Sequence, residues 1–272
     1  MNFKTKHFNS LSTLLIIALL SVFTLQSCKE KPKKNDAELA PEEITSSDDF
    51  KSIFDGTTLN GWNGDSTYWS VVDGTIVGEI TPETLLKSNT FIIYENDQLA
   101  DFELKLEFKI SEDGNSGINY RSDQLDTIPY ALRGYQADID GKIRYTGQNY
   151  EERKRATLAY RGEKAEITAQ DNADVKGSLR GNVKNNCWQN RNILRELGNS
   201  DSLKTKIKSN DWNAAHLIIK GNKLQHYING VLMSEVIDND SINSMTAGKL
   251  GMQVHVGPPM KVEYRNIMLK EL

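Results

Sequence analysis

Three short segments of the sequence carry polar side chains whose types and spacing suit a hydroxyl-rich ligand. In each segment apolar and polar residues alternate, and a β-strand points alternate side chains to opposite faces. The polar faces hold Asn119 and Arg121 in "SGINYRS" (116–122), Gln136, Asp138 and Asp140 in "GYQADID" (134–140), and Gln253 and His255 in "GMQVHVGPP" (251–259). Such groups donate or accept hydrogen bonds in fixed directions, as sugar hydroxyls require. The pattern predicts one concave outer surface that binds a small saccharide; the alternative is scattered surface residues that never meet.

Another segment of the same chain has the pattern of an ordinary solvated strand. "FELKLEFKI" (102–110) places apolar side chains on one face and Glu and Lys in alternation on the other, as in a sheet face with nothing bound to it. Two further histidines fit structural roles, because His226 shares a face with Leu224 and Ile228, and His216 begins a strand. No HxxxH, HxH or CxxC spacing occurs, so no dedicated metal site is predicted.

The elements that must position these residues are almost all strands. "WSVVDGTIVGE" (69–79) predicts a hairpin around Asp-Gly, and "HLIIKGNKLQHYINGVLMSEV" (216–236) predicts three antiparallel strands joined by Gly-Asn and Asn-Gly turns. Further strands are predicted at 91–94, 102–110, 117–121, 134–139, 156–160, 249–256 and 261–270. Many strands with closely spaced turns indicate an all-β, antiparallel two-sheet sandwich. Residues 163–211 lack a strand pattern and are predicted to be a long functional loop, in which "NRNILREL" forms a short helix.

The N-terminal segment predicts export and a lipid anchor. Two lysines precede a short apolar run, and "LQSC" (25–28) follows it, which is the order of a secretory signal. The cysteine after a small residue resembles a bacterial lipobox, so residues 1–28 are predicted to be a lipoprotein signal with Cys28 lipidated; the alternative is a plain signal with a chance cysteine. Residues 29–47 are charged and contain prolines, which favours a flexible tether. We therefore expect an exported protein anchored to a bacterial membrane.

Length, cysteine content and charge narrow the class of protein further. The chain of 272 residues leaves room for one β-rich domain, predicted at 48–272. Cys187 is the one cysteine beyond Cys28, so no intrachain disulfide is predicted in the mature chain and its core alone must hold the domain. The formal net charge of −4 and the lack of a basic stripe argue against nucleic acid as a partner.

Several motifs in order resemble the 3-keto-disaccharide hydrolase family over residues 50–272. They are "FKSIFDGTTLNGWNGDSTYWSVVDGTIVGE", "DFELKLEFKISEDGNSGINYRS", "GYQADI", "DWNAAHLIIKGNKLQHYINGVLM" and "GKLGMQVHVGPPMKVEYRNIMLKEL". The resemblance implies a concanavalin A-like jelly-roll sandwich that acts on glycosides oxidised at C3. The commoner family pattern has a Glu where this chain has Gln136, and an amide where it has Asp138, so the carboxylate has moved two positions along one strand face.

The implied substrate defines the chemistry that the site residues would perform. A ketone at C3 makes the C2 proton acidic, so a base can remove it, the C1 substituent leaves, and water adds to the unsaturated keto sugar. We predict His255 as the base, because its ordinary pKa of about 6.5 suits neutral pH, and Arg121 as the cation that faces the enolate oxygen. Asp138 would orient His255 or act as the base itself.

Other side chains are predicted to contact the saccharide: Asn119, Gln136, Gln253, Arg155, Arg161 and Trp188. For the two arginines the alternative is pairing with nearby glutamates, and for the tryptophan it is anchoring of its loop. A divalent ion at the keto-enolate is chemically attractive, but no ligand spacing requires one. The alternative function is a non-catalytic carbohydrate-binding module on the same sandwich, which exposed aromatic residues such as Trp62 and Tyr68 would favour.

Overall fold

The computed structural model describes residues 49–96, 98–170, 182 and 184–272. The predicted signal with Cys28 and the predicted tether lie outside the described residues. Among the helices that are described, none is long and apolar enough to cross a membrane.

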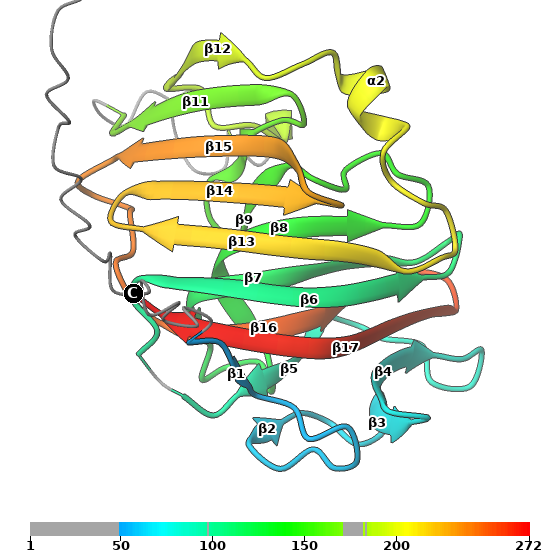
Figure 1. Cartoon of the computed structure of the whole chain (residues 1–272). Coiled ribbons are helices and arrows are strands. Elements are labelled where there is room, and N and C mark those ends of the chain that lie inside the picture. The colour runs from blue at the N-terminus through cyan, green and yellow to red at the C-terminus, as the bar shows by residue number, and fades with distance from the viewer. Residues whose placement is uncertain (1–48, 97, 171–181, 183) are drawn as a thin grey trace, which may run out of the picture. The chain divides into compact units, whose positions relative to one another are not determined.

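Two stacked β-sheets make the fold (Figure 1). The larger sheet contains β1 (Lys51–Ser52), β3 (Trp69–Val72), β4 (Thr75–Ile80), β6 (Phe102–Ile110), β11 (Glu163–Thr168), β12 (Arg191–Glu196), β13 (Asn213–Lys220), β14 (Lys223–Ile228), β15 (Val231–Asn239) and β17 (Met260–Glu271). The smaller sheet contains β2 (Trp62–Asn63), β5 (Thr90–Tyr94), β7 (Asn115–Gln124), β8 (Leu132–Asp140), β9 (Asn149–Glu152), β10 (Ala156–Ala159) and β16 (Lys249–Val254). A short helix, α2 (Ser200–Lys204), follows β12.

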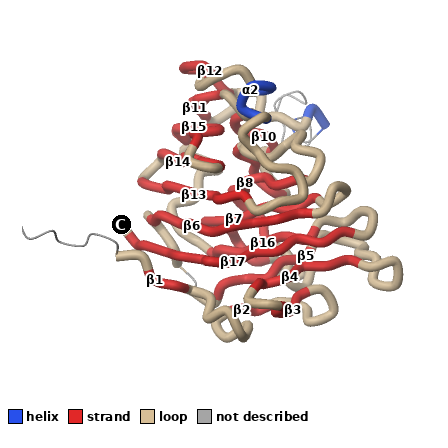
Figure 2. Tube along the Cα trace, turned by 45° about the vertical axis from the view of Figure 1, so that its right-hand side comes forward, coloured by secondary structure: helices blue, strands red, loops and turns tan. Residues whose placement is uncertain are grey.

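The strands of each sheet are paired mainly with antiparallel neighbours. The ten-stranded sheet has the order β12-β11-β15-β14-β13-β6-β17-β4-β3 with β1 on β17, and the seven-stranded sheet has the order β10-β9-β8-β7-β16-β5-β2. One strand pair, β11 with β15, is parallel. Figure 2 shows how strands dominate the described chain, with loops joining them at their ends. The predicted all-β, two-sheet sandwich of the concanavalin A-like jelly-roll class is confirmed.

The predicted hairpins form at the expected turns. Asp73 and Gly74 both have positive φ, 47° and 76°, and join β3 to β4; Asn229 and Gly230 do the same between β14 and β15, with φ of 50° and 77°. Turns of this kind need positive φ at both central residues, which Asn, Asp and Gly adopt at the least cost. The local sequence therefore sets the register of both hairpins.

The core lies between the two sheets and confirms the alternation of the 102–110 strand. All five apolar side chains of β6 are at most 5% exposed, while its Glu and Lys residues point outward. The inner face of the smaller sheet contributes residues such as Tyr120, Tyr135 and Met252 to the same core. Since successive side chains alternate, their neighbours along β7, β8 and β16 face the other side of that sheet.

The prediction of a long loop over 163–211 is wrong in part. The region contains β11 and β12, and "NRNILREL" forms the strand β12 rather than a helix. β12 is an edge strand in which Ile193 and Leu194 are both exposed, by 40% and 46%. Because neither of its faces is buried, apolar and polar residues do not alternate along it, and the sequence shows no strand pattern. Residues 171–181, which belong to the same predicted loop, lie outside the described part of the chain.

Candidate active site

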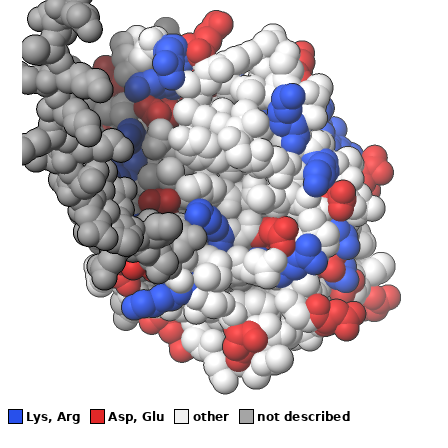
Figure 3. All heavy atoms as spheres, in the orientation of Figure 1, with Lys and Arg blue, Asp and Glu red and all other residues white. Residues whose placement is uncertain are grey.

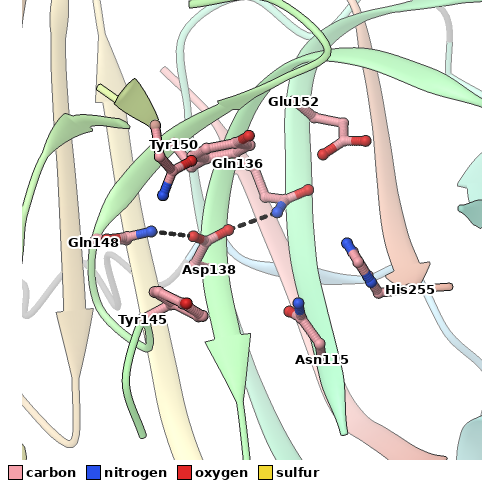
Figure 4. A pocket seen from close by; sticks show the side chains of 9 residues that line it. Asn115, Gln136, Asp138, Tyr145, Gln148, Tyr150, Glu152 and His255 are labelled. Carbon is pink, nitrogen blue, oxygen red and sulfur yellow. Dashed lines mark hydrogen bonds between the residues drawn. The ribbon is translucent and has the colours of Figure 1, made fainter. Parts of the chain in front are cut away.

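A polar pocket of about 190 Å³ opens on the outer face of the seven-stranded sheet (Figure 4). Its walls come from β7, β8 and β9, from the turns that follow β8 and β16, and from Asn186. The lining residues are Asn115, Gln136, Asp138, Tyr145, Gln148, Tyr150, Glu152, Asn186 and His255. Amides, carboxylates, tyrosines and an imidazole thus converge on one small space.

Asp138 lies at the centre of this pocket, held by two amides. Gln136 Nε2 donates to its Oδ1 at 2.5 Å and Gln148 Nε2 donates to its Oδ2 at 2.5 Å (Figure 4). Burial raises the pKa of the Asp138 carboxyl to about 7, the charges of Glu152 and Asp140 add to the rise, and the two amide hydrogen bonds oppose it. A carboxyl that titrates near neutrality and whose ionised form is hydrogen-bonded is suited to take up a proton.

The amide of Gln136 is itself fixed by residues beneath the pocket. Gln253, which is fully buried, donates from Nε2 to Gln136 Oε1 at 3.3 Å, so the Gln136 NH₂ group turns to Asp138. The Gln136 side chain lies over Gly117, where a Cβ atom would come within 2.4 Å of Gln136 Cδ. The sequence therefore needs glycine at 117 to leave space for this amide.

His255 forms the wall opposite Asp138 (Figure 4). It directly follows β16, and its backbone N–H donates to the Asn115 carbonyl oxygen at 3.2 Å. Its Nδ1 lies 2.6 Å from the carbonyl oxygen of Val256, which can only accept, so Nδ1 carries the proton. In the neutral ring Nε2 is then left as the acceptor, and protonation would make it a donor.

The sequence analysis missed six of the lining residues: Asn115, Asn186 and four that come from β9 and the turn before it. Glu152 is buried and accepts from Asn89 Nδ2 at 3.0 Å. Burial and the charges of Glu152 and Asp138 raise the pKa of Tyr150, so its hydroxyl stays protonated. Tyr145 belongs to the turn after β8, and Gln148 directly precedes β9. Tyr150 and Glu152 share one face of β9, so the period-two rule could have found them, whereas nothing local marks the other two.

The turn that carries Tyr145 is tied down by Asp140. Its Oδ1 accepts the backbone N–H groups of Tyr145 and Thr146 at 2.8 and 2.9 Å, and its Oδ2 accepts that of Arg144 at 2.9 Å. Asp140 was predicted on the polar face with Asp138, but it holds a loop and does not line the pocket. Its carboxylate instead fixes the part of the wall next to Asp138.

The structure brings together three of the predicted site residues in the pocket and leaves two just below it. Gln136, Asp138 and His255 line the cavity. Gln253 lies behind Gln136, and Asn119 is fully buried with its Nδ2 3.3 Å from Ser122 Oγ. The shared strand face was thus read correctly, but burial keeps the last two amides away from a ligand.

The expected position of Arg121 has to be corrected. Its φ is 43°, and the pairing of β7 with β8 shifts register between Tyr120 and Asp123, so the alternation stops there. The guanidinium, 2% exposed, pairs with Asp101 at 2.8 Å and donates to the carbonyl oxygen of Gly221 at 2.7 Å. It joins loops away from the pocket and does not face a substrate there.

Arg155, Arg161 and Trp188 are likewise corrected to structural positions. Arg155 is fully buried and binds three carboxylates, those of Glu151, Asp238 and Asp240. Arg161 donates to the carbonyl oxygens of Thr146 at 2.8 Å and Ser200 at 3.1 Å. Trp188, 2% exposed, donates from Nε1 to the Thr168 carbonyl oxygen at 3.0 Å and so anchors its segment. The alternative of pairing with a glutamate holds for Arg155 and that of anchoring holds for Trp188, whereas Arg161 binds backbone carbonyl oxygens in place of a glutamate.

The remaining histidines have the structural roles that their strand patterns indicated. His226 is fully buried, with Nε2 2.9 Å from the Tyr120 hydroxyl, and burial lowers its pKa to about 4. His216 pairs with Glu103 at 2.8 Å on the outer face of the larger sheet. Over the described ranges, no group of three or more His, Cys, Asp or Glu side chains could hold a metal ion.

Comparison with known proteins agrees with a carbohydrate-active sandwich domain. The model of the 3-keto-alpha-glucoside-1,2-lyase-like domain family matches residues 49–270, and the chain belongs to this family. A 3-keto-disaccharide hydrolase of Bacteroides thetaiotaomicron is 34% identical over 85 residues, which are 29% of this chain and 29% of the relative's length.

Two solved structures are similar to this chain at low sequence identity. A candidate glycosyl hydrolase from Parabacteroides distasonis is 19% identical, with a TM-score of 0.49, over 82% of this chain and 94% of that one. The carbohydrate-binding module CBM66 from Bacillus subtilis is 14% identical, with a TM-score of 0.46, over 77% of this chain and 95% of the other.

Proposed function

We propose that this protein cleaves 3-keto-glycosides, including 3-keto-disaccharides, at the pocket around Asp138, by elimination and subsequent hydration. One observation carries the proposal: a buried carboxyl group, with its pKa raised to about 7, faces an imidazole across a pocket lined by amides, tyrosines and a second carboxylate. Membership of the 3-keto-alpha-glucoside-1,2-lyase-like family and the partial match to a 3-keto-disaccharide hydrolase support the substrate class.

In this mechanism Asp138 removes the C2 proton. The electron pair of the C2–H bond forms the enolate with the C3 carbonyl, and the proton goes to a carboxylate oxygen. Asp138 suits this role better than His255, because both of its oxygens accept amide hydrogen bonds that favour the ionised form. The amide of Asn115 and the hydroxyl of Tyr150 are the lining donors for the enolate oxygen.

His255 is then the acid that protonates the leaving oxygen. As the enolate collapses, C1 and C2 become doubly bonded, the bond from C1 to its oxygen breaks, and Nε2–H supplies the proton to that oxygen. Water adds at C1 and a proton returns to C2, which completes hydrolysis. The Val256 carbonyl, 2.6 Å from Nδ1, orients the ring so that Nε2 is the nitrogen that serves the leaving oxygen.

The non-catalytic binding module is not favoured as an alternative. A binding platform would expose flat aromatic rings, but Trp62 and Trp188 are only 5% and 2% exposed. The pocket instead gathers titratable groups. The exported, lipid-anchored location stays part of the proposal, and Cys28→Ala tests it: we expect the variant to leave the membrane fraction and keep its activity.

The test of function is turnover of chemically oxidised glycosides. The purified chain should release reducing sugar from 3-keto-trehalose or a 3-keto-glucoside and leave the corresponding unoxidised glycoside intact, because only the ketone acidifies the C2 proton. Cleavage of the unoxidised glycoside at a similar rate would contradict the proposal, as would no cleavage of either compound.

A further inference from the structure

A second cavity, of about 430 Å³, adjoins the pocket around Asp138 and shares part of its wall. Tyr150, Glu152 and His255 line both spaces. The first pocket alone is smaller than the roughly 300–1000 Å³ that is typical of small-molecule sites. A substrate of two groups would therefore extend from one cavity into the other, across the residues that they share.

The shared wall fixes which part of the substrate occupies which cavity. If the oxidised ring lies against Asp138, as the proposed function requires, the bond that breaks lies near His255, the group that protonates the leaving oxygen. His255 belongs to both cavities, so the leaving group enters the second one. The second cavity is the larger, and it can hold a group at least the size of the sugar.

The second cavity differs from the first in its charge. The second cavity is lined by three basic residues, Lys87, Arg153 and Lys154. Among the described residues that line the first pocket there is no Lys or Arg. Its one acidic residue, Glu152, is engaged by Asn89 at 3.0 Å and by Arg153 at 3.6 Å. Lys154 pairs with Glu151 at 3.4 Å, and Arg153 pairs with Glu152 through Nε, so Lys87 and the terminal nitrogens of Arg153 are the cationic donors for a ligand.

Arg153 is held at this rim by an unusual backbone conformation. It begins the turn between β9 and β10 with φ of 56°, a region that non-glycine residues seldom occupy. Ser88 Oγ accepts one N–H of its guanidinium at 2.7 Å and Nε lies 3.6 Å from Glu152, which leaves three N–H donors on the same planar group. Strained residues of this kind cluster at ligand sites, and the guanidinium fork matches a carboxylate or sulfate.

We propose that the second cavity is the leaving-group subsite and that it selects leaving groups bearing an anionic substituent, a carboxylate or a sulfate. This inference rests on the proposed function, because the reacting ring sets the direction of the substrate. Lys87 and Arg153 are the residues that recognise the anion.

Matched substrates test the proposal. We compare 3-keto-glucosides whose leaving groups are 4-carboxyphenol, its neutral isostere 4-carbamoylphenol, and 4-sulfooxyphenol, with kcat/KM as the readout. The wild-type chain should prefer the carboxylate over the carboxamide by about tenfold, as expected for a charge-assisted hydrogen bond. The sulfate arm shows which of the two anions is preferred.

Charge-removing variants then assign the preference to this cavity. Lys87→Gln and Arg153→Gln should each lower the acid-to-amide ratio by roughly three- to tenfold, with little change for the carboxamide. Lys220→Gln, an exposed lysine at the end of β13 in the other sheet, is the matched control and should leave the ratio unchanged. Equal rates on acid and amide in the wild type, or an unaltered ratio in both variants, would overturn the subsite.

Failure of the proposed function gives a different result from failure of the subsite. If none of the 3-keto-glucosides is cleaved, the reaction is wrong, and calorimetric binding of the unoxidised carboxyphenyl and carbamoylphenyl glucosides still decides the anion preference. Tighter binding of the acid that is lost in Lys87→Gln supports the subsite; equal binding of the two contradicts it.

Discussion

The two sheets of the sandwich turn outer faces of different character to their surroundings. On the ten-stranded sheet, charged side chains pair at the surface: His216 with Glu103 at 2.8 Å, Arg265 with Glu107 at 2.8 Å, and Lys109 with Glu263 at 3.0 Å. Figure 3, in the orientation of Figure 1, shows both signs of charge scattered among uncharged atoms on this side. Such exposed pairs contribute about 0–1 kcal/mol each to stability.

The outer face of the seven-stranded sheet is covered where Asp138 lies. The turn after β8 and the segment after β16 rise beside it and carry Tyr145 and His255. Asp138 is 8% exposed and has amide partners in place of a counter-ion. Both faces follow the same strand alternation, so the difference comes from what covers them. Enclosure by loops changes a carboxylate from a solvated surface charge into a group that titrates near neutrality.

Replacing the central carboxylate should give the largest loss. Asp138→Asn keeps the shape and removes the base, so kcat/KM on a 3-keto-glucoside should fall by about 10³–10⁴-fold, the upper part of the usual contribution of general-base catalysis. Glu107→Gln also removes one negative charge, but on the outer face of the other sheet. Its kcat/KM should stay within about twofold of the wild-type value. Similar losses in the two variants would remove the distinction between the faces.

Replacing the opposite wall should cost less. His255→Gln removes the acid that protonates the leaving oxygen and should lower kcat/KM by about 10²-fold. This loss is smaller than for Asp138→Asn, because the leaving oxygen can depart as an anion without a proton. The loss should shrink for nitrophenolate leaving groups, which need no proton. An equal loss for good and poor leaving groups would contradict the assignment of His255 as the acid.

The buried amide below the pocket tests how the carboxylate is positioned. Gln253→Leu leaves Gln136 Oε1 without its donor, so the amide bond to Asp138 weakens, and we expect about a tenfold loss. Since that bond favours the ionised form, the rising limb of kcat/KM against pH should move upward from about 7. The matched control is Gln225→Leu, which removes an amide bonded to Glu235 on the larger sheet and should leave the pH profile in place.

The free energy of unfolding should depend on pH differently in the wild type and in Asp138→Asn. The folded pKa of Asp138 is raised from 3.8 to about 7, so its contribution to stability is complete below about pH 4 and is lost as pH rises through 7. Between pH 4 and 7 the wild type should therefore lose up to about 4 kcal/mol of unfolding free energy that Asp138→Asn does not lose. Urea unfolding at several pH values measures it, and a constant difference would contradict the raised pKa.

The sequence predicted the sandwich and the strand face of the site because both depend on alternation. Gln136 and Asp138 could be placed on one face from the period of two, and Gly-Asn and Asn-Gly turns marked the hairpins. Arg121 could not be placed, because its positive φ and the register shift of β7 against β8 follow from pairing that the local sequence does not record.

The walls of the pocket were harder to predict for a similar reason. Gln148 and Tyr145 reach it from a turn whose shape depends on Asp140 accepting three backbone N–H groups. Arg155 looked available for a ligand, yet the carboxylates that bury it come from β9, β15 and the residue after β15. Side chains that depend on distant partners are visible only in the folded chain.

The most direct test of the central claim follows the C2 hydrogen of the substrate. The wild-type chain is given a 3-keto-glucoside in D₂O, and the released 3-keto sugar is examined by NMR at early times, when the free sugar still keeps its C2 proton in an enzyme-free control. Proton removal by Asp138 predicts deuterium at C2 of the product, and almost no product with Asp138→Asn. A wild-type product that retains its C2 proton, or an Asp138→Asn variant that forms deuterated product at the wild-type rate, would contradict the account.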